Sequence, residues 1–195
     1  AEGRSAFIPP ERRQGFQFWR ACECTHNYNH SLYYGDTPEK KYWDGYDAIA
    51  QTREAQRYIR EHASGGPFAL FLSWGPPHDP YGTAPPQYKA RVPEPEKLRL
   101  RPNVPESKQQ EARQMLAGYY AHISALDWCF GALMQSLDRL GLAESTLVIF
   151  TSDHGDMLFS HDRGWKSKPW RESVIVPFIA RWPGIIPAGA TERAP

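Results

Sequence analysis

An acidic residue and a histidine stand side by side in the segment Asp153-His154-Gly155-Asp156. Such a pair can present a carboxylate oxygen and an imidazole nitrogen to one divalent metal ion, and Gly155 permits a tight turn of the backbone around it. A loop in which Asp153 caps the following segment and His154 faces water explains the same residues equally well. Asp153 and His154 are therefore candidate metal ligands, with this second interpretation still open.

A second reactive position is His78, which lies in the segment Pro77-His78-Asp79-Pro80. Prolines stiffen a loop, and a stiffly held imidazole suits contact with an anionic group. Taken alone, the segment is explained more simply by a histidine that pairs with Asp79. Lys166 offers a point charge that would neutralise an anionic substrate. His78 and Lys166 are the candidate catalytic residues.

Three further histidines are weaker candidates for substrate binding. His26 and His30 have a spacing that occurs in zinc sites, but no helical periodicity surrounds them, so a loop in contact with substrate or solvent is favoured. His161 lies in the polar segment that leads to Lys166.

Short apolar runs precede the two strongest candidates. Residues 68–74 lead into His78, and residues 146–150 lead into Asp153. Runs of this length between breakers are typical of strands buried in a parallel sheet, whose carboxyl ends form the edge where ligands bind. We therefore expect these side chains to meet at one edge. Residues 176–181 have the pattern of a third strand.

Two helices are expected between these strands. Thr37-Pro38 has the residue types of a helix start, and the first helix would run to about residue 62. Apolar residues at spacings of three and four predict a long helix over 109–140, with Gly141 as its stop. Alternating strands and helices predict an α/β fold with a mostly parallel sheet flanked by helices. A proline-rich loop fills residues 75–108.

Composition excludes several classes of protein. The 195 residues carry 23 basic and 22 acidic side chains, a net charge of +1, and this balance argues against a nucleic-acid binder. No apolar run approaches the roughly 18 residues of a membrane span. The three cysteines are too few for a disulfide framework.

Taken together, several segments resemble the sulfatase family of the alkaline-phosphatase-like superfamily. Their order and spacing over residues 67–184 carry the resemblance, and residues 9–16 resemble bacterial members. The segments are Phe71 to Tyr81, Tyr119 to Asp127, Phe150 to His161, Lys166 to Ser173 and Val176 to Gly184.

The resemblance implies hydrolysis of a small sulfated substrate. Family members use a formylglycine nucleophile, made from Cys or Ser in a Cys/Ser-x-Pro-Ser/Ala-Arg motif, and a divalent metal ion, usually Ca²⁺. By position, Asp153 matches a metal ligand, and His154 stands where many members have Asn. His78 and Lys166 match residues that contact the sulfate group. Because imidazole suits transition metals better than calcium, Mn²⁺ or Mg²⁺ stays an alternative to Ca²⁺.

The sequence also departs from the family pattern. None of Cys22, Cys24 and Cys129 begins the nucleophile motif. We therefore expect residues 1–195 to be the central part of one catalytic domain, truncated at both ends, that is inactive alone and lacks the formylglycine region. Two alternatives remain: a phosphonate monoester hydrolase or phosphodiesterase of the same superfamily, and a non-catalytic remnant.

Overall fold

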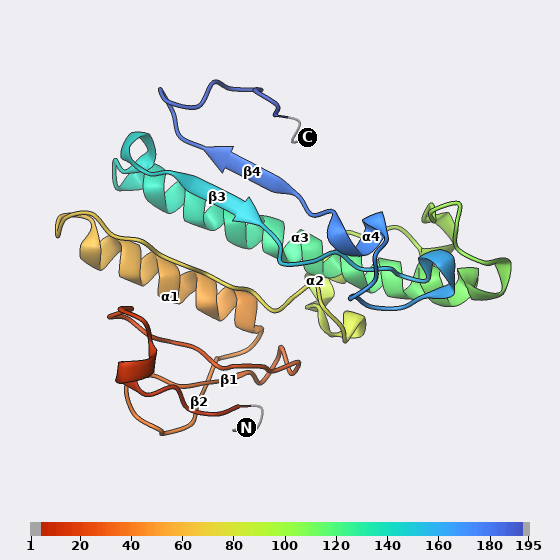
Figure 1. Cartoon of the computed structure of the whole chain (residues 1–195), viewed down its shortest axis with the longest axis horizontal. Helices are drawn as coiled ribbons and strands as arrows, with labels where there is room; N and C mark the ends of the chain where they lie inside the picture. Colours follow the sequence, from red (N-terminus) through yellow and green to blue (C-terminus); the bar gives the residue numbers. More distant parts are fainter. Residues whose placement is uncertain (1–4, 193–195) are drawn as a thin grey trace.

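Two long helices form the centre of the computed structural model, which describes residues 5–192. Helix α1 (Asp47–His62) and helix α3 (Gln109–Arg139) lie against each other (Figure 1). Ala48, Ala125 and Cys129 are fully buried between them. Small side chains let two helix backbones approach closely, and they exclude water from the contact.

The first helix is shorter than predicted, because it begins at Asp47 rather than near Thr37. Lys41–Tyr42 (β2) instead pairs with Leu32–Tyr33 (β1) in an antiparallel ladder. Gly45, with a φ of +70°, turns the chain just before the helix begins. The predicted end at His62 is confirmed.

The long helix matches its prediction closely. The amide of Leu142 donates to the carbonyl of Leu137 over 2.9 Å, and the amide of Gly141 donates to Asp138 over 3.2 Å. Gly141 has a φ of +68°, so the helix ends in a Schellman motif. The apolar stripe of the helix is not buried throughout, because Ile123 is 41% exposed.

The prediction of a mostly parallel sheet is not confirmed. Val148–Thr151 (β3) pairs with Phe178–Arg181 (β4) in an antiparallel register that joins Val148 to Arg181. Residues 68–74 form no strand, because no described segment bonds along them. This segment runs in the same direction as β3 in Figure 1, and its Phe68 and Leu70 pack on the same apolar cluster as Val148.

The opposite faces of these extended segments are open. Phe71 is 77% exposed, Phe178 68% and Ile149 52%. The α/β arrangement of residues 5–192 is therefore covered by helices on one side, while large apolar side chains line the other.

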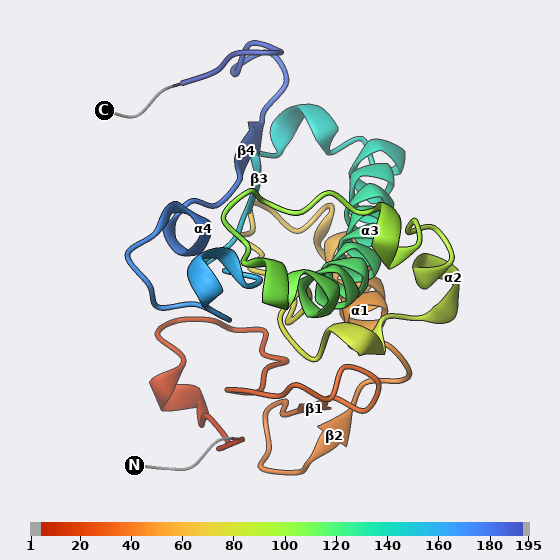
Figure 2. The ribbon, with the colours of Figure 1, turned by 90° about the vertical axis from the view of Figure 1, so that its right-hand side faces the viewer.

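The proline-rich loop is ordered and wraps around the N-terminal half of α3 (Figure 2). Tyr81, Tyr88, Leu98 and Val104 are its buried anchors. None of the described helices is both long and apolar enough to cross a bilayer. The short elements are η1 (Pro10–Arg12), η2 (Tyr81–Thr83), α2 (Pro86–Lys89), η3 (Pro95–Lys97), η4 (Glu106–Lys108), η5 (Ala143–Ser145), η6 (Ser160–Asp162) and α4 (Arg171–Val174).

Candidate functional site

The loop that carries His78 is held by Tyr28. The Tyr28 hydroxyl donates to the backbone carbonyls of His78 at 3.0 Å and Asp79 at 3.1 Å. The Tyr28 ring is 1% exposed, and burial raises the pKa of its hydroxyl, so it remains a donor. At Gly75 a Cβ would lie 2.8 Å from this ring, which explains the glycine. We call these contacts the Tyr28 clamp.

The clamp leaves both nitrogens of His78 engaged. Nδ1 lies 2.8 Å from a carboxylate oxygen of Asp79 and 3.1 Å from the Asp79 carbonyl oxygen, so it carries the hydrogen. Nε2 lies 3.0 Å from Nζ of Lys166 and therefore accepts from the ammonium group. The two candidate catalytic side chains, 88 residues apart in sequence, thus meet.

The segment after β3 reaches the same place. The rings of His78 and His154 are in edge-to-face contact, with centroids 6.1 Å apart. The structure therefore brings together the two loops that follow residues 68–74 and β3.

The Asp153–His154 pair has the donor set of a cation site. His154 Nδ1 lies 2.7 Å from the Gly155 carbonyl oxygen, so Nδ1 donates and Nε2 carries a lone pair. That Nε2 lies 3.5 Å from a carboxylate oxygen of Asp153, whose side chain is 84% exposed. Two acceptors this close, with the second imidazole nitrogen fixed by a carbonyl, fit a shared divalent ion.

Close packing, rather than a positive φ, explains the glycine at position 155. Its amide donates to the Ser173 carbonyl at 2.8 Å, and an added Cβ would collide with the carbonyl of Glu172. The close approach seats the Asp153–His154 loop on α4.

Lys166 lies in a strained loop. Phe159, Trp165 and Ser167 all have positive φ values, a conformation that costs energy for residues with side chains. The Met157 amide donates to the Trp165 carbonyl at 2.9 Å, which closes the loop on itself.

The three weaker candidates have different surroundings. His26 packs on His78, with ring centroids 4.5 Å apart. His30 instead stacks on Tyr42. His161 stacks on Trp170 and lies 3.0 Å from the Asn103 amide nitrogen. Only His26 of these three is in contact with the His78 side chain in the described contacts.

Sequence reasoning missed several residues that shape the site. Tyr28 fixes the loop of His78, and Tyr81 donates a 2.6 Å hydrogen bond to Asp156, next to the Asp153–His154 loop. The pairing of His78 with Asp79, which the sequence suggested as the simpler interpretation, is confirmed. Neither Tyr28 nor Tyr81 had a local signal in the sequence.

Comparison with known proteins identifies the family. The family model described as Sulfatase matches residues 3–194. The ulvan-active sulfatase of Formosa agariphila is 45% identical over 98% of this chain and 38% of its own length. The endo-4-O-sulfatase of Bacteroides thetaiotaomicron is 28% identical over 93% of this chain and 37% of its own length. The chain therefore belongs to the sulfatase family.

Solved structures agree with this assignment. The crystal structure of yidJ from Bacteroides fragilis, assigned to the sulfatases, superposes with a TM-score of 0.85 at 30% identity over 91% of this chain and 40% of its own. The fold is thus the alkaline-phosphatase-like α/β fold of sulfatases, enzymes that hydrolyse sulfate esters and generally use a divalent metal. The chain spans less than two fifths of the length of the curated relatives named above.

Proposed function

We propose that these 195 residues supply the sulfate-binding side and part of the metal-binding side of a sulfatase active site. The observation that carries this proposal is the meeting of His78, Lys166 and His154. A cationic ammonium group beside an imidazole suits the negative charge of a sulfate ester.

Each side chain has a distinct role in this proposal. Lys166 donates to a sulfate oxygen and neutralises its charge, and His78, held by the Tyr28 clamp, fixes the Lys166 ammonium group and contacts the same sulfate group. Asp153 and His154 would hold the divalent ion, with Ca²⁺ as the first choice and Mn²⁺ or Mg²⁺ as alternatives. When bound, such an ion supplies charge stabilisation to the reacting group. His26 is proposed to contact the substrate beside His78, and its ring packing on His78 supports this role.

The nucleophile is proposed to come from sequence outside these 195 residues, as a formylglycine. In support, no cysteine of the chain begins the family motif. The chain is thereby proposed to be the central part of a catalytic domain. The name of the most similar relative reported above makes ulvan the first substrate to test.

A phosphonate monoester or phosphodiester hydrolase is the second candidate, and His154 favours it. An imidazole ligand tilts the metal preference toward Mn²⁺ and similar ions. A non-catalytic, anion-binding remnant is the third.

Two assays separate these proposals. The 195-residue chain should show no hydrolysis of an aryl sulfate, whereas the protein extended by the sequence encoded upstream should hydrolyse it. Faster hydrolysis of an aryl phosphonate than of an aryl sulfate by the extended protein would favour the second candidate. An upstream sequence without the nucleophile motif, and no hydrolysis, would favour the third.

A further inference from the structure

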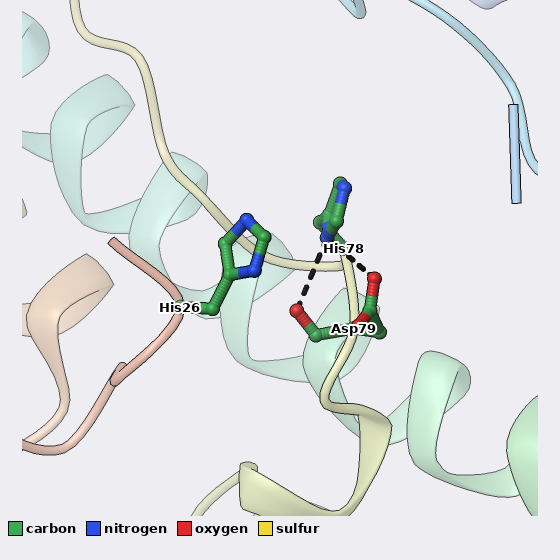
Figure 3. A group of neighbouring side chains, drawn as sticks. All are labelled: His26, His78 and Asp79. Carbon is green, nitrogen blue, oxygen red and sulfur yellow. Dashed lines mark hydrogen bonds and ion pairs between the residues drawn. The ribbon is translucent and has the colours of Figure 1, made fainter. Parts of the chain in front are cut away.

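Three potential metal ligands lie together at His78. They lie on the side of Nδ1, which faces Asp79, whereas Lys166 bonds to Nε2. His26, His78 and Asp79 each offer one ligand atom, and these atoms all lie within 4.8 Å of one another. Figure 3 shows the two imidazoles beside each other with Asp79 next to His78. Among the described residues, no other group of this kind is found.

The types of these ligands select the class of metal. Two imidazoles and one carboxylate form a set used for Zn²⁺, whereas Ca²⁺ and Mg²⁺ prefer several oxygen ligands. The thiol of Cys24 lies 3.8 Å from His26 Nε2, which places a soft donor beside the same imidazole. The group shares no ligand with the Asp153–His154 pair.

The backbone already holds the ligands in place. The Tyr28 clamp fixes the carbonyls of His78 and Asp79, and Tyr28 lies only two residues after His26. The Tyr28 side chain therefore positions both chain segments of the site. His26 is exposed, and His78 and Asp79 are half-buried, so an ion can enter from solvent.

From this geometry we propose that His26, His78 and Asp79 form a Zn²⁺ site, separate from the divalent site of Asp153 and His154. Three protein ligands leave a fourth position for water. Zn²⁺ on Nδ1 of His78 would leave the hydrogen of that imidazole on Nε2, which ends the hydrogen bond from Lys166, so zinc would inhibit hydrolysis. This consequence, unlike the site itself, rests on the proposed function.

Calorimetric titration of the metal-free chain with ZnCl₂ tests the site directly. We expect one tight site in the wild type. His26→Ala should weaken binding by at least about 100-fold, and Asp79→Asn by at least about 10-fold, since a ligand is lost. His30→Ala is the matched control, because His30 lies in the same loop but stacks on Tyr42, and it should bind zinc like the wild type. Circular dichroism verifies the fold of each variant.

The proposal is overturned if the wild type binds no zinc, or if folded His26→Ala and Asp79→Asn variants bind it normally. It is also overturned if Asp153→Asn abolishes zinc binding, because zinc would then occupy the other site. In the extended enzyme, zinc should inhibit aryl sulfate hydrolysis in the wild type and at least about tenfold less in His26→Ala. Absence of hydrolysis in the zinc-free wild type would count against the proposed function and leave the calorimetric result unchanged.

Discussion

A single hydrogen bond of 3.0 Å between Lys166 and His78 defines the cationic centre of the site. The ammonium group donates to an imidazole nitrogen that carries a lone pair, and its other hydrogens can bond to an anion. A lysine at this place contributes a full charge, which no neutral donor replaces.

Lys166→Met should therefore remove most of the activity of the extended enzyme. We expect kcat/KM for an aryl sulfate to fall by about 10²–10³-fold, as for loss of one group that stabilises transition-state charge. Lys168→Met is the control, two residues away, and should stay within about threefold of the wild type. Equal losses in both variants would show that general surface charge, rather than Lys166, matters.

The sequence predicted which residues could be reactive better than it predicted which residues contact them. Asp153, His154 and His78 each follow an apolar run, and this local pattern identified them. That His26 rather than His30 or His161 touches His78 depends on the Tyr28 clamp, which spans 50 residues of sequence. No periodicity or spacing encodes a contact of that kind.

Among the elements, the Tyr28 clamp connects the loop before β1 to the loop that carries His78. Tyr28→Phe removes a hydroxyl shared by two carbonyls and should lower the free energy of unfolding by about 1–2 kcal/mol. It should also lower kcat/KM by about tenfold, because His78 loses its fixed position.

Tyr34→Phe separates these two effects. Tyr34 is also buried, and its hydroxyl donates to the Ser5 carbonyl at 2.9 Å. We expect a similar loss of stability, measured by denaturant unfolding, with unchanged kcat/KM. A parallel loss of activity in both variants would assign Tyr28 a purely structural role.

Helix α3 contains two glycines with opposite expected behaviour. A Cβ at Gly118 would collide with the backbone of Tyr81, whereas one at Gly131 meets nothing within 4 Å. Gly118→Ala should destabilise the protein by about 2–4 kcal/mol through overpacking. Gly131→Ala should stabilise it by up to about 1 kcal/mol, because alanine is the better helix former. Thermal unfolding of the two variants measures the difference.

The helices were predictable and the sheet was not. The bounds of α3 follow from apolar spacing and a C-terminal glycine, which act within a few residues. Strand identity depends on neighbours that are distant in sequence. Residues 68–74 were expected to be a strand buried on both faces, yet alternate residues are exposed and no described segment bonds along them. Strand β4 joins β3 antiparallel where a parallel neighbour was expected.

For the molecule as a whole, Asp47 makes stability depend on pH. It is 2% exposed at the start of α1, and burial raises its pKa to about 6 despite hydrogen bonds from Ser31 and the Ala48 amide. Between the unfolded pKa of 3.8 and about 6, the folded protein binds more protons than the unfolded chain. Stability from this group is therefore present below that window and is lost as the pH rises through it.

Asp47→Asn should flatten this slope. The shift of roughly two pH units corresponds to about 3 kcal/mol, so the variant should gain about 1–3 kcal/mol relative to the wild type at pH 7.5. Urea unfolding at several pH values measures this, with the exposed Asp44→Asn as the control. Identical pH profiles for wild type and Asp47→Asn would contradict the prediction.

The α/β class and the sulfatase resemblance were accessible from sequence because both depend on the order of segments along the chain. The exposed apolar face with Phe71 and Phe178 was not accessible from sequence. A strand buried on both faces and a strand buried on one face can have the same run of apolar residues.

The Tyr28 clamp has a consequence for protein engineering. The segment that carries His26 and the segment that carries His78 are joined by the Tyr28 hydroxyl. Transfer of either segment alone into another protein would therefore lose the contact between the two histidines. Chimeras between this protein and its relatives should therefore exchange residues 24–30 and 75–81 together, and evolution of new selectivity at this site would require compensating changes in both segments.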